Sequence, residues 1–154
     1  MNKTYKPVQR LLIISCSATK LDTDQTLPAK QLYDGPAYRI LRKNAETLSQ
    51  GGNLCVLVVS AKYGIIGCDE LISTYEQRMT AERGAEILAD DHSQGLLQFC
   101  LSDRFELSAI HVHCSPDYRT ALPMEQLLQR GATVATGGIG QQLGQLKRWL
   151  VQGA

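Results

Sequence analysis

The 154-residue chain lacks the features that would place it in a membrane or on a highly charged partner. No apolar run approaches the roughly 20 residues that span a bilayer, and residues 1–6 show no signal-peptide hydrophobic stretch. The formal net charge of +1 lacks the basic excess that would support nucleic-acid binding, although it excludes no class of partner. We therefore expect an ordinary soluble protein with no membrane partner.

The chain also lacks a paired cysteine pattern. Its five cysteines are an odd number, are widely spaced and include no C-x-x-C pair; they are Cys16, Cys55, Cys68, Cys100 and Cys114. This pattern argues against a disulfide framework and against a zinc knuckle, and it predicts a reduced, cytoplasmic protein. Cys55 and Cys100 are expected to fill space in or near the core.

Length and hydrophobic pattern predict one α/β domain over residues 1–154. The hydrophobic share is 44% and the charged share 20%, as in ordinary globular proteins. Short runs rich in Val and Ile alternate with longer segments of helical period, which is typical of βα units. We therefore expect a three-layer sandwich with a mostly parallel sheet of about four strands. The predicted strands are residues 11–14, 56–59, 109–113 and 132–135.

Four helical segments are expected between and after these strands. The first begins at Asp34-Gly35-Pro36 and ends at Gly51-Gly52, and the second begins near Thr80 with a break at Gly95. The third follows Pro116, and the fourth covers residues 140–151. Two long connections remain, residues 19–33 and 62–79, and connections of this length in a compact domain are usually functional.

Each predicted strand runs into a loop of small polar or glycine residues. In an open parallel sheet the carboxyl ends of the strands share the edge where ligands bind, so the four loops predict one polar pocket. The first loop offers Ser15, Ser17 and Lys20 as ligand-binding residues, but it has none of the glycines of a P-loop. Cys16 is a candidate nucleophile activated by Lys20, and a buried, inert thiol is the alternative.

The second long connection is the densest in candidate functional residues. Asp69, Glu70 and Glu76 are its candidate acid–base groups, although solvated carboxylates are the alternative. Its candidate ligand-binding residues are Lys62, Tyr63, Gly64, Tyr75 and Arg78. Tyr33, before the first helix, is a further candidate to stack on a base, with packing beside the helix start as the alternative.

The remaining two loops are expected to form walls of the pocket. Ser115 follows the third strand, and Gly137, Gly138 and Gln141 follow the fourth, where a glycine turn before a helix favours an anion. The Rossmann fingerprint is not met there, so no nucleotide cofactor is expected. His111 and His113 point to one face of their strand. His113 is a candidate acid–base group, and no third ligand supports a metal site.

Several short motifs carry resemblances to known families. The residues Tyr63-Gly64-Ile65-Ile66, Leu71-Ile72, Tyr75 and Met79 resemble the Y-G-L-L…L-I-x-P-Y-x-x-x-M stretch of the YaaA peroxide-stress family, with Thr74 in place of the proline. Ser17 and Lys20 match that family's S-P-A-K. The chain is more similar to short bacterial and phage proteins with a domain of unknown function, which share C-S-x-x-K, L-Y-x-x-x-x-[FY] and S-A-K-Y-G-[LI]-[LI]. The C-S-x-x-K motif also resembles one in archaeosine synthase.

These resemblances imply a pocket for a nucleotide, nucleoside or modified nucleobase. The YaaA family is associated with DNA binding and oxidative stress, and its core is similar in outline to the uracil-DNA glycosylase fold. Archaeosine synthase handles a deazaguanine base. A reaction at an N-glycosidic bond, by a glycosylase or base transferase, is therefore the candidate activity, and whether the chain is an enzyme stays open.

Two other functions stay open beside this one. The first is a non-catalytic, YaaA-like DNA-binding stress-response protein. In that case the cations that contact phosphates are expected to be Lys62, Arg78, Lys147 and Arg148. The second is a thiol enzyme centred on Cys16. The expected partner is thus a small nucleotide or base, with nucleic acid as the alternative, and the residues leave the oligomeric state open.

Overall fold

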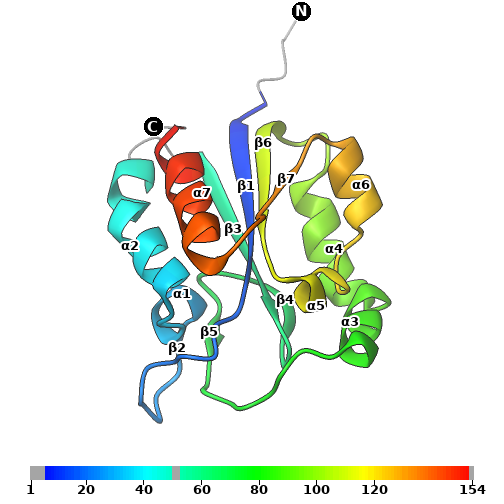
Figure 1. Cartoon of the computed structure of the whole chain (residues 1–154). Coiled ribbons are helices and arrows are strands. Elements are labelled where there is room, and N and C mark those ends of the chain that lie inside the picture. Colours follow the sequence, from blue (N-terminus) through cyan, green and yellow to red (C-terminus); the bar gives the residue numbers. More distant parts are fainter. Residues whose placement is uncertain (1–5, 50–52, 153–154) are drawn as a thin grey trace, which may run out of the picture.

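The computed structural model describes residues 6–49 and 53–152 of the chain. Strands and helices alternate along most of it (Figure 1). In order, the elements are β1 (Val8–Ser15), β2 (Leu27–Pro28), α1 (Ala29–Leu32), α2 (Pro36–Ser49), β3 (Leu54–Ser60), β4 (Gly64–Gly67), β5 (Leu71–Ile72), α3 (Ala81–Leu88), α4 (Asp91–Cys100), β6 (Glu106–His113), α5 (Pro116–Arg119), α6 (Met124–Gln129), β7 (Thr133–Val134) and α7 (Ile139–Gln152).

The main sheet has five strands in the order β4-β3-β1-β6-β7. β1, β3, β6 and β7 pair in parallel, which confirms the predicted mostly parallel α/β sheet. The fifth strand, β4, is antiparallel to β3 and forms one edge. It arises because Gly64 adopts a φ of +79°, a conformation open to glycine, and turns the chain back directly after β3.

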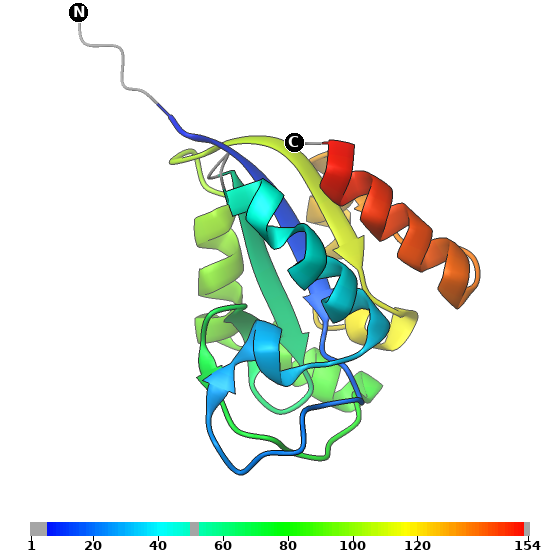
Figure 2. The same ribbon diagram turned by 90° about the vertical axis from the view of Figure 1, so that its left-hand side faces the viewer.

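Helices cover both faces of this sheet (Figures 1 and 2). The central strand β1 directs Leu11 and Ile13 into one core, together with residues of α3, α4 and α6. It directs Leu12 and Ile14 into the other core, together with residues of α1, α2 and α7. Because both faces of β1 are covered, its side chains form a continuous apolar run rather than an alternating one.

Two of the expected helices are divided differently in the structure. The second helical segment breaks at Ala89–Asp90, not at Gly95, which lies inside α4. The break falls there because the Asp90 carboxylate accepts a hydrogen bond from the Ser93 amide and so begins a new helix. The third segment forms two short helices, α5 and α6, separated at Pro123. The expected stop of the first helix, Gly51-Gly52, lies outside the described residues.

The two long connections fold onto each other. β2 from the first and β5 from the second form a two-stranded antiparallel sheet with Leu27 opposite Ile72. The amides of Ala29 and Lys30 donate to carbonyl oxygens of the second connection, each at 2.9 Å. Lys20 also forms an isolated bridge with Tyr33. This pairing gathers both connections at the carboxyl edge of the main sheet, at the lower end of Figure 1.

The helices of the described residues differ from membrane-spanning helices in length and apolar character. Across residues 6–49 and 53–152, none combines the two to the extent that crossing a bilayer requires.

Candidate functional site

The chain leaves the neighbouring strands β1 and β6 toward opposite faces of the sheet. After β1 it continues to α1 and α2 on one face, and after β6 it continues to α5 on the other. Such a divergence is the topological switch point at which open α/β sheets bind ligands. A cavity of about 170 Å³ lies there. We call it the switch-point pocket. The residues that line it include Ser15, Cys16, Ser17, Gly35, Tyr38 and His113.

The end of β6 contributes a buried histidine to the switch-point pocket. His113 is 9% exposed, and its Nδ1 atom has no hydrogen-bond partner. Burial lowers the pKa of His113, so the imidazole is neutral near pH 7. A buried polar atom without a partner is unfavourable, and His113 is one of the residues that line the pocket.

The loop after β1 is held from two sides. The Cys16 thiol donates a hydrogen bond to the Tyr118 hydroxyl at 3.2 Å, and the Tyr38 hydroxyl donates to the Ser15 carbonyl at 2.8 Å. Tyr118 belongs to α5, so Cys16 bridges the divide between the two loops. Sequence reasoning missed Tyr118, although its place in the loop after a predicted strand was an available signal. The Tyr38 ring is itself buried.

A chain of buried hydroxyl groups lies next to this loop. The hydroxyl oxygens of Tyr33 and Tyr75 are 2.7 Å apart, and the Ser60 oxygen is 2.8 Å from that of Tyr75. Burial raises the pKa of Tyr33 to about 12 and also raises that of Tyr75, so both stay protonated. Tyr33 is fully buried, with its ring against Tyr38 and Tyr75. The Tyr33 ring therefore packs within the protein instead of presenting a face to a base.

Two lysine ammonium groups lie over tyrosine rings in this region, Lys20 over Tyr75 and Lys62 over Tyr63. The Nζ atom of Lys20 is 4.5 Å from the Tyr75 ring centroid, and the Nζ atom of Lys62 is 5.3 Å from that of Tyr63. These are cation–π distances. Tyr63 is half-buried, and its hydroxyl donates to the Ser73 carbonyl at 3.1 Å. Four of the predicted ligand-binding residues thus lie near one another beyond the ends of β1 and β3. They are Lys20, Lys62, Tyr63 and Tyr75.

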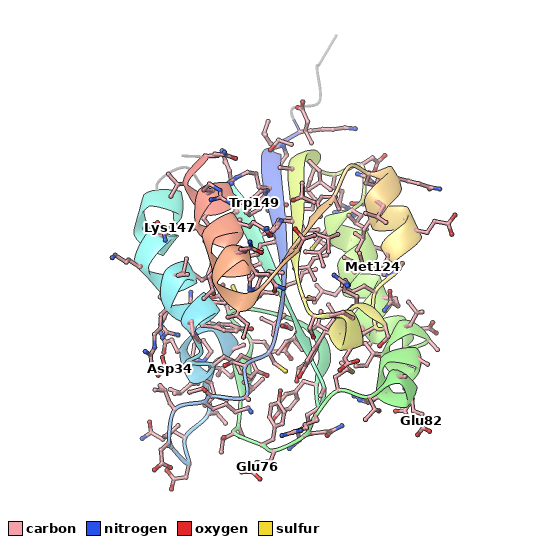
Figure 3. All side chains as sticks on the ribbon, in the orientation of Figure 1. Asp34, Glu76, Glu82, Met124, Lys147 and Trp149 are labelled. Carbon is pink, nitrogen blue, oxygen red and sulfur yellow. The ribbon has the colours of Figure 1, made fainter. Side chains whose placement is uncertain are left out.

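A second depression lies on the other side of the 15–20 loop. It has a volume of about 220 Å³, and its charged lining residues are Lys20, Asp22 and Glu76. Glu76 is the one predicted acid–base carboxylate in this lining (Figure 3). One ammonium therefore faces two carboxylates here.

The other predicted charged residues lie elsewhere. Asp69 forms an ion pair with Lys30 at 2.5 Å, in which the Asp69 side chain is largely exposed and that of Lys30 is half-buried. Glu70 and Arg78 are exposed and line neither cavity at the carboxyl edge.

The glycine turn before α7 is closed by side chains of α7 itself. The Gly138 amide donates to Gln141 Oε1 at 3.0 Å, and the Thr136 amide donates to Gln145 Oε1 at 3.0 Å. Gly137 adopts a φ of +81°, so the turn does require a glycine. Two of the amides at this turn, those of Thr136 and Gly138, are therefore already engaged. Ser115, the remaining predicted wall residue, is exposed directly before α5.

No set of three or more His, Cys, Asp or Glu side chains gathers as a metal site within the described residues.

Comparisons with known proteins place the chain in a family but not in a functional class. No curated protein matches it. The resemblances to the YaaA family, to uracil-DNA glycosylase and to archaeosine synthase thus rest on the quoted motifs alone. Residues 11–152, nearly the whole chain, match DUF6884, described as a family of unknown function. The chain therefore belongs to the family DUF6884, which agrees with the predicted domain of unknown function.

Proposed function

We propose that this protein binds a nucleoside or a free, native or modified nucleobase in the switch-point pocket. The observation that carries the proposal is the unpartnered Nδ1 atom of His113 at the switch point, with Cys16 and two serines around the same cavity. The edge of a base presents several donors and acceptors in one plane, and such an edge would supply the missing partner. The C-S-x-x-K resemblance supports the same ligand class.

The size of the pocket supports a small ligand. Pockets for drug-sized molecules hold about 300–1,000 Å³. A cavity of about 170 Å³ suits one planar ring system and is too small for a dinucleotide. The sugar would then extend across the 15–20 loop toward the second depression, which holds Thr23 and Thr74 as well as Lys20.

The charges favour a nucleoside over a nucleotide, the other ligand class that the motifs imply. Lys20 shares the second depression with two carboxylates, those of Asp22 and Glu76, so a phosphate there would meet net negative charge. At the glycine turn before α7, the amides of Thr136 and Gly138 donate to glutamine side chains and are not free for phosphate. Sugar hydroxyl groups can both donate and accept, and they suit such a mixed lining.

A reaction at the N-glycosidic bond is the enzymatic extension of this proposal. Glycosidic-bond hydrolysis commonly uses carboxylates as acid and base, and Glu76 is the predicted carboxylate at the depression. On this reading Glu76→Gln would keep nucleoside binding and lose release of the free base. If no free base appears with any nucleoside, the protein is a binding protein only.

The test is a thermal-shift and calorimetry series with nucleosides, nucleotides and deazaguanine bases. A ligand at about 100 times its Kd stabilises the folded state by about 2.7 kcal/mol, which raises Tm by about 5–10 °C in a domain of this size. Gly35→Ala should reduce this rise, because its added Cβ would displace the Ser17 hydroxyl at the pocket. The matched control is Gly95→Ala, whose Cβ meets no atom within 4 Å.

Two outcomes would contradict the proposal. One is the absence of any shift across the whole panel, and the other is an equal shift in Gly35→Ala and Gly95→Ala. Salt-dependent binding of duplex DNA that is unchanged in Gly35→Ala would favour the alternative DNA-binding function. Alkylation of Cys16 much faster than of the other four cysteines would favour the alternative thiol enzyme.

A further inference from the structure

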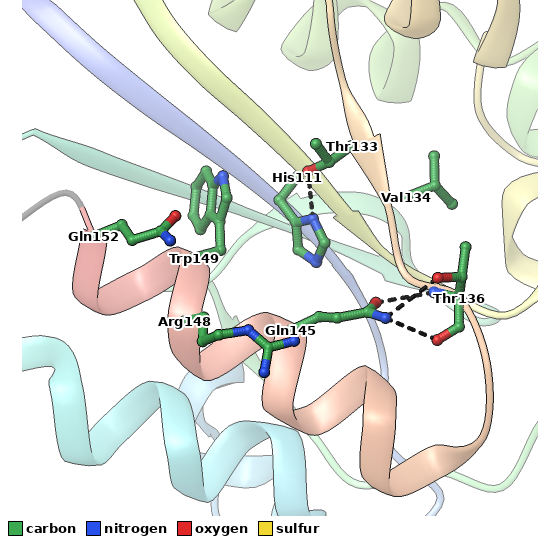
Figure 4. Close-up of a pocket in the computed structure, with 8 residues that line it drawn as sticks. All are labelled: His111, Thr133, Val134, Thr136, Gln145, Arg148, Trp149 and Gln152. Carbon is green, nitrogen blue, oxygen red and sulfur yellow. Dashed lines mark hydrogen bonds between the residues drawn. The ribbon is translucent and has the colours of Figure 1, made fainter.

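A second pocket lies between α7 and the β7 edge of the sheet, away from the switch point (Figure 4). It has a volume of about 230 Å³. The sheet contributes His111, Thr133 and Val134, and α7 contributes Arg148, Trp149 and Gln152. We call it the α7 pocket. The α7 residues at the switch-point pocket, Ile139 and Leu143, lie on the other side of the helix by its 3.6-residue period.

His111 is a buried polar group at this pocket with one unused nitrogen. Its side chain is 3% exposed and stacks on Trp149 with ring centroids 5.7 Å apart. The Nδ1 atom lies 2.7 Å from Thr133 Oγ1, whereas Nε2 has no partner (Figure 4). Burial lowers the pKa of His111 to about 4, so the ring is neutral near pH 7.

The hydrogen bonds of Thr133 indicate which nitrogen carries the proton. The Thr133 hydroxyl has one proton and two possible acceptors, His111 Nδ1 at 2.7 Å and the Ile110 carbonyl at 3.3 Å. The carbonyl can only accept, so the hydroxyl donates to Ile110 and His111 Nδ1 donates to Thr133 Oγ1. The ring proton of the neutral His111 then lies on Nδ1, which leaves Nε2 as a buried acceptor without a partner.

The charges around the α7 pocket are positive and lack a carboxylate. Arg10 is 7% exposed, and its guanidinium lies 4.5 Å from the Trp149 ring centroid. Its hydrogen bonds go to the neutral carbonyl oxygens of Trp149 and Leu150. Among the described side chains, neither Arg10 nor Arg148 forms an ion pair, and no acidic residue lines the pocket. Buried charges are normally paired, so this region favours an anion.

We propose that the α7 pocket binds a small organic acid. Its carboxylate would lie on the Arg148 guanidinium, with the Gln152 amide as a further donor. Its apolar body would contact Val134 and the edge of the Trp149 indole. The apolar walls are the reason to prefer an organic acid over inorganic phosphate. This site is separate from the proposed nucleoside site and does not depend on it.

The only tryptophan of the chain is Trp149, so its fluorescence and its indole N–H resonance report on this pocket alone. Benzoate, with one ring and one carboxylate, is the probe, and neutral benzamide is its matched control. We expect a saturable change with benzoate and none with benzamide. Arg148→Gln should weaken benzoate binding about tenfold or more, because a charge-assisted hydrogen bond contributes about 1.5–3 kcal/mol. Lys147→Gln removes the adjacent exposed cation of α7 and should leave the affinity unchanged.

Several results would overturn the proposal. The first is no change in either Trp149 signal at about 10 mM benzoate, a concentration above a millimolar Kd. The second is an equal response to benzoate and benzamide. The others are equal effects of Arg148→Gln and Lys147→Gln on benzoate affinity, and an equal affinity of the pocket for inorganic phosphate. The ¹⁵N resonance of His111 Nε2 should also move with benzoate, and an unmoved resonance would remove His111 from the site. Gly35→Ala should keep the full benzoate response, so failure here is distinguishable from failure of the nucleoside proposal.

Discussion

Tyr75 connects residues that are far apart in the chain. Its hydroxyl lies within hydrogen-bond distance of Tyr33, which follows α1, and of Ser60, which ends β3. Lys20 lies over the ring of the same residue. From the sequence, Tyr33 is a candidate to stack on a base, and Tyr75 is a candidate ligand-binding residue. In the structure both are buried, since the two long connections fold together over them.

Tyr75→Phe should therefore destabilise the protein by about 1–3 kcal/mol, the range for leaving buried polar groups without a partner. The Tyr33 hydroxyl loses its partner, whereas Ser60 still accepts hydrogen bonds from the amides of Lys62 and Tyr63. Urea denaturation measures the change. Tyr63→Phe is the control, because its hydroxyl bonds only to the exposed backbone of Ser73, and it should change stability by less than about 1 kcal/mol. Equal effects of the two variants would contradict the buried role of Tyr75.

The helices α3 and α4 show how far sequence signals locate an element. Helical period and the Thr80 cap predict the start correctly, and the Thr80 hydroxyl does accept from the Arg83 amide. Glycine lowers helix propensity, which made Gly95 the expected break. The actual break at Asp90 depends on a capping hydrogen bond to Ser93. The Ser93 hydroxyl also accepts a hydrogen bond from the Ile65 amide of β4. This contact joins distant segments, so the local sequence does not reveal it.

Two glycines of these helices should respond oppositely to alanine. Gly95→Ala should stabilise the protein by about 0.5–1 kcal/mol, because alanine favours the helix and its Cβ meets nothing within 4 Å. Gly84→Ala should destabilise it, because its Cβ would collide with the Thr120 side chain and lie 3.2 Å from the Thr120 backbone carbon. Thermal unfolding compares the two. A rise in Tm for Gly84→Ala would show that Thr120 does not fix the approach of α3 to α5.

At the scale of the whole molecule, α7 covers two neutral histidines of β6. His111 and His113 are both buried, and their ring centroids are 6.4 Å apart. Burial is the main cause that lowers the pKa of each, and the mutual interaction lowers that of His111 further. Arg148 of α7 lines the same pocket as His111, and Arg10 of β1 lies over the Trp149 ring that stacks on His111. Charging either histidine therefore works against the packing of α7 on the sheet.

The protein should lose stability as the pH falls from about 6.5 toward about 4. The unfolded chain binds a proton at His111 near its usual pKa of 6.5, whereas the folded protein binds it only near pH 4. Stability is thus fully present above pH 6.5, and at about pH 5 His111 alone should remove about 2 kcal/mol of the free energy of unfolding. Urea denaturation at about pH 7.5 and about pH 5 measures this loss. His111→Asn should show a smaller loss between the two pH values, and an equal loss would contradict the assignment.

The amino-acid sequence by itself determines the four parallel strands, the approximate extents of the first and last helices and the family of the chain. These properties depend on apolar runs, helical period and short motifs, which are local. Its polar strand-end loops also predict the edge of the sheet at which a site would lie. It does not predict β4 as a strand, because that strand depends on the pairing of residues 64–67 with β3.

Only the tertiary structure decided which of these loop residues meet. The switch-point pocket needs the chain to leave β1 and β6 toward opposite faces, and crossover direction is not a local property of either loop. The hydroxyl chain needs the β2–β5 pairing, and the α7 pocket needs Trp149 to stack on His111, 38 positions earlier. Each of these contacts joins segments distant in sequence. Burial, which sets the neutral state of both histidines, exists only once the sheet is covered on both faces.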